Sequence, residues 1–108
     1  MVREKLSDLL KALQNGTTNG RVVWQELPDE QMFRAHLAGG MVRIGQIETA
    51  GKRGYAIWVI GIGGAIVGEL EVFEDDVNWT LIEQIYMTAR MKARGGEQLI
   101  NHMIAMLS

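Results

Sequence analysis

The sequence predicts a single two-layer α+β domain, with an N-terminal helix, a four-stranded antiparallel meander, and a C-terminal helix that is broken or bent at Gly95-Gly96. Three observations predict this fold class. Apolar residues recur at helical spacing near both ends of the chain, they alternate with polar residues in between, and the connections between strand-like segments are short enough for hairpins. At 108 residues the chain can build one core of two packed layers, so we expect one domain over residues 1–108.

The first segment has the pattern of an amphipathic helix that covers a core. Charged residues separate apolar ones at helical spacing, namely Val2, Leu6, Leu9, Leu10 and Leu13. Asn15 and Gly16 follow them, and both tolerate the left-handed conformation found at helix ends. We therefore expect the helix to end at this pair.

Strand character begins in GRVVWQEL (20–27), where β-branched and aromatic residues are frequent. It returns over 31–37, 41–49, 55–61 and 65–73. Turns are expected at Pro28-Asp29, Gly39-Gly40, Gly51-Lys52 and Gly63-Gly64, because proline presets φ and glycine accepts positive φ.

These turns predict the pairing of the strands, because a slip of one residue moves a side chain to the other face. Trp24 is expected opposite Phe33, Leu37 opposite Val42, and Ile44 opposite Val59. The face covered by the helices should then hold Val22, Trp24, Phe33, Ala35, Leu37, Val42, Ile44, Tyr55, Ile57 and Val59, joined by Ile66, Leu70 and Val72.

The opposite, outer face of the sheet is apolar for a face that no helix covers. Trp58 is expected across from Gly45, with its ring over bare backbone, and His36 is expected opposite Arg43. An apolar patch with charged residues at its rim is typical of an association or binding surface. The candidate interface or ligand-binding residues are Arg34, His36, Arg43, Ile47, Trp58, Ile60 and Val67, with Glu69 also at the rim.

The C-terminal part predicts a helix through Ile82, Ile85, Tyr86, Ala89 and Ala93. Glu74, Asp75 and Asp76 precede it, and their position favours a capping role over metal binding or acid–base work. Beyond Gly95-Gly96, a last short helix carries the apolar stripe Leu99, Ile100, Met103, Ile104 and Leu107. The pattern leaves open whether this stripe packs on its own subunit or on a neighbour.

No motif in the chain predicts a catalytic residue, a cofactor site or a metal site. GIGGAIVG (61–68) has the glycine content of a dinucleotide-binding loop, but a β-branched strand follows it where a helix N-terminus is needed. We interpret it as a hairpin turn. With no cysteine and only His36 and His102 as histidines, the chain lacks the residues for Cys-ligated or three-histidine metal sites.

Charge and hydropathy argue against nucleic acid and membranes as partners. The formal net charge is −2, and Arg90, Lys92 and Arg94 suit the negative end of a helix dipole. The N-terminus carries charges every few residues, unlike a secretory signal, and the uncharged run 55–68 is too short to span a bilayer. We therefore expect a cytoplasmic protein.

Three stretches carry a resemblance to other proteins: NGTTNGRVVWQEL, FRAHLAGGMVRI, and IYMTARMKARGGEQLINHMI after a Tyr-led strand and hairpin. In them the chain resembles a group of short uncharacterised bacterial α+β proteins with no assigned activity. Those proteins usually have a polar Asp, Glu and Gly turn where this chain has GIGG. The resemblance to such accessory proteins, often associated with mobile elements or phages, implies a binding module rather than an enzyme.

The sequence thus favours a non-enzymatic interaction module that self-associates as a dimer through its outer sheet face. The alternative is a small anionic-ligand-binding protein, or an enzyme, with Trp58 as a platform and Arg34, Arg43 and His36 as anion contacts. An unidentified protein is a further possible partner. Weak nucleic-acid binding through the arginines is a third hypothesis.

Overall fold

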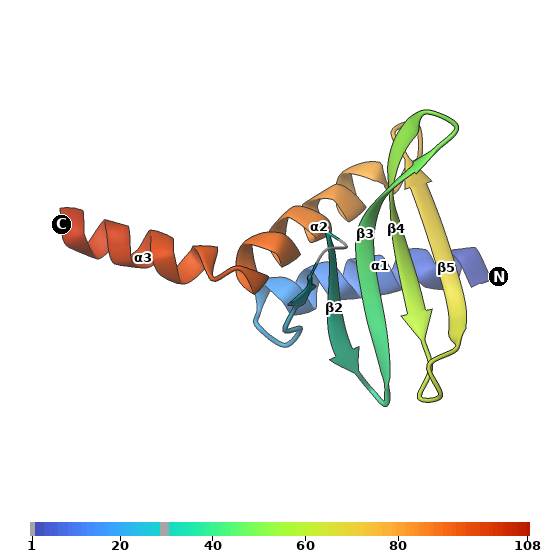
Figure 1. Ribbon diagram of the computed structural model, residues 1–108, viewed down its shortest axis with the longest axis horizontal. Helices are drawn as coiled ribbons and strands as arrows, with labels where there is room; N and C mark the ends of the chain where they lie inside the picture. Colours follow the sequence, from blue (N-terminus) through green and yellow to red (C-terminus); the bar gives the residue numbers. More distant parts are fainter. Residues whose placement is uncertain (1, 29–30) are drawn as a thin grey trace.

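The computed structural model of the chain describes residues 2–28 and 31–108 and confirms an α+β architecture (Figure 1). The elements are α1 (Val2–Thr18), β1 (Gln25–Leu27), β2 (Met32–Leu37), β3 (Gly40–Thr49), β4 (Lys52–Ile60), β5 (Ile66–Phe73), α2 (Trp79–Ala93) and α3 (Gly96–Leu107). The strands form one antiparallel meander in the order β1-β2-β3-β4-β5. The sheet has five strands, one for each of the five stretches with strand character, so the predicted four-stranded meander is one strand short. The first of these stretches, GRVVWQEL, contributes only its end, Gln25–Leu27, as a short edge strand paired with β2.

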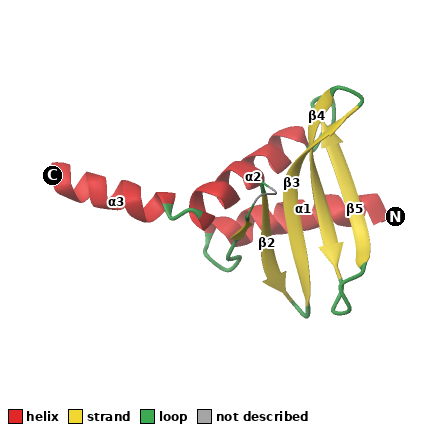
Figure 2. Cartoon of the chain, viewed as in Figure 1, coloured by secondary structure: helices red, strands yellow, loops and turns green. Residues whose placement is uncertain are grey.

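Helices α1 and α2 lie side by side on one face of the sheet, and α3 projects away from the body beyond the β1–β2 side (Figure 2). The core between these two layers holds Leu6, Leu10, Leu13, Val22, Trp24, Phe33, Ala35, Val42, Ile44, Tyr55, Ile57, Leu70, Val72, Ile82, Ile85, Tyr86 and Ala89. Aromatic rings bridge the layers, since Tyr86 lies 5.5 Å from Phe33 and 5.1 Å from Tyr55 between ring centroids. The predicted core face is thus largely confirmed, with Leu37 and Val59 half-buried at its margin.

The first helix does not end at Asn15-Gly16 as predicted but continues to Thr18. Gly16 is needed for close packing instead, because a Cβ added to it would lie 2.6 Å from Cγ2 of Val22. The chain turns back after the helix at Gly20, whose φ of +83° is the left-handed conformation expected at a helix end.

Both central hairpins turn one residue earlier than predicted. The turn residues are Ala38-Gly39 and Ala50-Gly51, all with positive φ, as in the type I′ turns that suit the twist of two-residue hairpins. The predicted pairings are therefore wrong by two residues: Val42 lies opposite Ala35 instead of Leu37, and Ile44 opposite Ile57 instead of Val59. A shift of two residues leaves every side chain on its predicted face.

The first predicted turn, Pro28-Asp29, extends into residues 29–30, outside the described ranges. The predicted pairing across it is also wrong, because Phe33 lies opposite Glu26. Trp24 precedes β1, yet its ring is buried in the core.

The last hairpin contains a bulge that overturns two burial predictions. Val59 pairs with Gly68, whereas Ile60 pairs with Ile66, so β5 has one extra residue at this point. Ile66, predicted in the core, is 60% exposed opposite Ile60, and Ile60, predicted as an exposed contact residue, is 6% exposed. The GIGG segment is a hairpin turn followed directly by β5, as predicted, with a φ of +86° at Gly64.

The acidic segment before α2 does not cap that helix. The N-cap is Asn78, without a side-chain cap, and the first turn of α2 contains no acidic residue. Asp76 stabilises the turn instead, because Oδ1 accepts a hydrogen bond from the backbone N–H of Asn78 at 2.8 Å. Its other carboxylate oxygen pairs with Arg3 of α1, so the carboxylate joins α1 to the turn that precedes α2.

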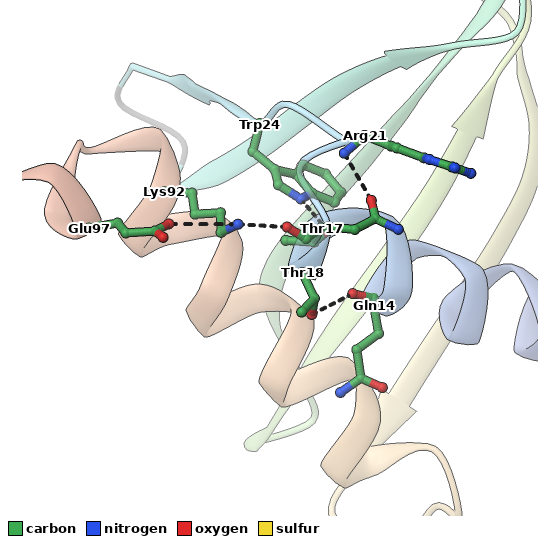
Figure 3. Close-up of polar contacts among 8 residues, drawn as sticks. Gln14, Thr17, Thr18, Arg21, Trp24, Lys92 and Glu97 are labelled. Carbon is green, nitrogen blue, oxygen red and sulfur yellow. Dashed lines mark hydrogen bonds and ion pairs between the residues drawn. The ribbon is translucent and has the colours of Figure 1, made fainter.

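A buried hydrogen bond joins the end of α1 to the start of the sheet (Figure 3). The indole Nε1 of Trp24 donates to Oγ1 of Thr17 at 2.9 Å, and both residues are buried. The carbonyl of Thr17 accepts a second hydrogen bond from Nζ of Lys92, at 2.7 Å, so α1, Trp24 and the end of α2 meet at one residue.

Replacement of Thr17 by valine tests this junction. The change keeps the shape but leaves the indole N–H of Trp24 buried without an acceptor, which we expect to lower the free energy of unfolding by about 1–3 kcal/mol. Urea unfolding measures the loss. The control is Thr18→Val, because the hydroxyl of Thr18 is exposed and donates to the carbonyl of Gln14 in its own helix. Equal losses in the two variants would contradict the assignment.

Candidate interaction surfaces

The outer face of the sheet is arranged in rows that run across the strands. One row consists of Gln25, Arg34, Arg43, Trp58 and Glu69, each opposite the next. Its neighbour consists of Leu27, Met32, Gly45, Ala56 and Glu71. Neither α1 nor α2 contributes to this face, because both pack on the other one. The outer face is therefore the uncovered side of the sheet.

Trp58 lies in the middle of this face, as predicted, but its neighbour on β3 is not the predicted one. It is opposite Arg43, whereas Gly45 is opposite Ala56. The side chain that covers the bare backbone of Gly45 is Met32, whose Cγ would lie 2.7 Å from an added Cβ. The half-buried Trp58 indole donates a hydrogen bond to the Glu69 carboxylate. The ring is thereby held by its own row, with part of its surface facing outward.

Two arginines lie side by side next to Trp58. Arg34 is directly opposite Arg43, and His36 is opposite Met41, so the predicted His36–Arg43 pairing is wrong. Nε of Arg34 lies 3.4 Å from Oε1 of Gln25, and Nε of Arg43 is buried without a hydrogen-bond partner. Across residues 2–28 and 31–108, neither guanidinium forms an ion pair with a carboxylate. Like charges in opposite positions destabilise a strand pair, so this pair favours an anionic contact.

The other candidate residues contribute unequally. Val67 is 67% exposed beside the bulge, His36 is exposed on β2, and Ile47 is half-buried on β3. Ile60 offers no contact area because it is buried in the monomer. The structure therefore brings Arg34, Arg43 and Trp58 together in one row, with the other four candidates on either side of that row.

The most exposed apolar surface on a single element is on α3, which the candidate set did not include. No residue of α3 is buried, although its sequence is strongly amphipathic. Leu99, Ile100, Met103, Ile104, Met106 and Leu107 are between 48% and 87% exposed. The apolar stripe was visible in the sequence, but its exposure depends on the direction of α3, which spacing alone does not predict.

The base of α3 is held by two basic residues. Arg94, directly after α2, forms a bidentate contact with the carboxylate of Glu26, with Nη2 to Oε2 at 2.7 Å, and its guanidinium lies 5.9 Å from the Phe33 ring centroid. Lys92 pairs with Glu97 of α3 at 3.7 Å (Figure 3). Arg94 and Lys92 thus engage in contacts within the chain, which lowers their availability for a phosphate backbone.

A cleft lies away from the outer-face row, between the β3–β4 hairpin and the start of α2. It has a volume of about 1180 Å³, and Tyr55, Phe73 and Trp79 are among its lining residues. Tyr55 and Trp79 have ring centroids 5.2 Å apart. Of the candidate residues only Ile47 lines this cleft, so the Arg34–Arg43–Trp58 row is a separate surface.

Metal-binding clusters and membrane-spanning helices are both absent from the described part of the chain. No group of three or more His, Asp or Glu side chains there is arranged to hold a metal ion. No described helix combines the length and apolar character needed to cross a membrane.

Comparison with protein-family models, with curated proteins and with solved structures gives no match. The resemblance to short bacterial accessory proteins stays a prediction. The surfaces of the molecule itself are therefore the basis for a proposed function.

The Glu26–Arg94 contact predicts a pH dependence of stability. The hydrogen bonds from Arg94 hold the pKa of the Glu26 carboxyl below its ordinary value of 4.5. A carboxyl with a lowered folded-state pKa contributes stability above its unfolded pKa and loses it as the pH falls through the folded-state pKa. We therefore expect Glu26→Gln to reduce the melting temperature slightly at pH 7. Below about pH 4.5, the melting temperature of this variant should fall less on acidification than that of the wild type.

Thermal unfolding between pH 7 and pH 3 measures the effect. Glu48→Gln is the control, because Glu48 lies on β3 without an ion pair in the described part of the chain. Identical acid profiles for Glu26→Gln and the wild type would show that the contact contributes nothing.

Proposed function

We propose that this protein is a non-enzymatic interaction module that self-associates, as a homodimer, with the outer face of its sheet in the contact. The observation that carries the proposal is that this whole face remains outside the two-layer core while its centre is aromatic and apolar. Trp58, Met32 and Met41 are half-buried there, and Arg34 and Arg43 lie beside them. Aromatic residues, methionine and arginine are the types enriched at protein interfaces.

Replacement of Trp58 by glutamate tests self-association. The change puts a second carboxylate opposite Glu69 and removes the largest ring of the face, so we expect the dimer to dissociate to a monomer at micromolar concentration. Sedimentation velocity measures the state, and circular dichroism checks the fold. The matched control is Val77→Glu, because Val77 is fully exposed in the β5–α2 turn, away from this face. A wild-type monomer at high micromolar concentration would contradict the proposal.

A second candidate function is the binding of a small anionic ligand by the same face. The observation that favours it is the pair Arg34–Arg43, opposite each other and without a carboxylate partner in the described ranges. Two adjacent guanidinium groups bind carboxylates and phosphates through charge-assisted hydrogen bonds. The ring of Trp58 next to them would supply a flat apolar platform, while His36 lies two residues further along β2.

Thermal unfolding with citrate and pyrophosphate as probes tests this second function. A ligand at 100 times its dissociation constant stabilises the folded state by about 2.7 kcal/mol, so we expect a clear rise in melting temperature. The rise should disappear in Arg34→Ala and persist in Arg53→Ala, an exposed arginine near the β3–β4 turn. If the Arg34→Ala protein responds as strongly as the wild type, the arginine pair is not the site.

A further inference from the structure

Helix α3 has an apolar face that its own subunit does not cover. At 100° per residue, its six large apolar residues fall within one half of the helix, and Glu97, Gln98, Asn101 and His102 fall on the other. A helix of this length is marginally stable in water without tertiary packing. Its main contacts in the described part of the chain are with α2, where a Cβ on Gly96 would lie 2.9 Å from Cγ of Met91. The apolar face is therefore free to contact a second molecule.

The area of this face indicates how a second copy can cover it. The six apolar residues of the stripe are between 48% and 87% exposed, and a stable interface buries about 800 Å² per partner. Pairing of α3 with α3 of another copy would bury only the stripe on each chain. If each copy instead places its α3 on the body of the other, each chain buries its own stripe and a receiving surface as well, so this contact is the larger of the two.

The outer sheet face has the dimensions and character of that receiving surface. Five strands at a spacing of about 4.8 Å give a face about 19 Å wide, and the 12 residues of α3 make a helix about 18 Å long. Met32, Met41, Ile47 and Trp58 are half-buried on this face, so a helix laid across it would complete their burial. Layers of helices on both faces of a sheet are a stable architecture.

A direct sheet-to-sheet contact would leave the apolar face of α3 uncovered. The outer sheet face carries Arg34 and Arg43 on β2 and β3, and Glu69 and Glu71 on β5. Helix α3 contains no lysine or arginine, and its one acidic residue is Glu97. The helix can therefore lie on the arginine-bearing face without like-charge repulsion.

We propose that two copies of this chain exchange their α3 helices, so that the apolar face of each α3 packs across the outer sheet face of the other copy. The inference rests on the proposed self-association and names what occupies the surface. The exchange is reciprocal, so the dimer has a two-fold axis and every contact occurs twice. The stripe on α3 and the row around Trp58 are then the two halves of one interface.

Site-specific cross-linking tests the exchange, because the chain has no cysteine of its own. Met103→Cys places a thiol on the apolar face of α3, and Met41→Cys places one on the outer sheet face. The two full-length variants are unfolded together in urea, refolded together, and treated with a short bismaleimide. We expect a covalent dimer in the mixture and none with either variant alone. The control mixture pairs Met103→Cys with Val77→Cys and should give no cross-link.

Each other outcome has a defined meaning. Cross-linking of Met103→Cys alone would show α3 paired with α3, and cross-linking of Met41→Cys alone would show sheet packed on sheet; either result overturns the exchange but not self-association. A wild-type monomer in sedimentation overturns both proposals. A wild-type dimer without a cross-link in the mixture overturns the exchange.

A double variant on α3 gives an independent measurement. Ile100→Glu with Ile104→Glu should halve the sedimenting mass without changing the melting profile of the monomeric body, because no residue of α3 is buried in the subunit. If this variant remains dimeric while Trp58→Glu is monomeric, α3 takes no part in the interface and the exchange is wrong.

Discussion

The whole architecture depends on one geometric constraint: a sheet has two faces, and both packing helices lie on the same one. Leu10 and Leu13 of α1 and Ile82 and Ile85 of α2 are fully enclosed against the sheet. The third helix leaves the body after Gly95, and none of its residues is buried (Figure 1). The outer face must therefore bury its apolar residues by packing within the sheet itself, and it does so only in part.

The outer face shows how far such packing within a sheet can go. Met32 covers the bare backbone of Gly45, and Ala56 opposite that glycine is fully enclosed. Trp58 finds an acceptor in Glu69, whereas Arg43 keeps a buried Nε without a partner. Unsatisfied buried groups are rare in folded proteins, and each one calls for an explanation. A contact that adds acceptors and apolar cover over this row would supply what the isolated subunit lacks.

Alternation of apolar and polar residues was enough to predict which face each strand residue occupies. The pattern has a period of two, so it stays correct when the register moves by two residues, as it does at both central hairpins. The position of the turns was harder, because a single alanine with positive φ, at Ala38 and again at Ala50, precedes the glycine. Neighbour relations such as Trp58 with Arg43 depend on that detail and were therefore missed.

Other differences arise from contacts between distant parts of the chain. The sequence predicts a helix end at Gly16, yet this glycine lies within the helix and allows Val22 to pack closely against it. The bulge in β5 likewise depends on the pairing of β5 with β4. The candidate surface was predicted in composition, since Arg34, Arg43 and Trp58 do share a row. The exposure of α3 was not predicted. It depends on the direction in which the chain leaves α2 at Gly95, and the amphipathic pattern of the helix does not specify that direction.

The conformation of Gly95 sets the direction in which α3 extends from the body. Gly95 has a φ of +71°, and the helix beyond it is a rod about 18 Å long with no side chain buried in the body. A rotation of about 30° at the base would carry the far end of the rod through roughly 9 Å. The ion pair between Lys92 and Glu97 lies in the first turn of α3, so it restrains the start of the helix more than its far end. The position of Met106 and Leu107 is consequently set by dihedral angles some ten residues away. The far end of α3 can therefore change position while the core stays unchanged.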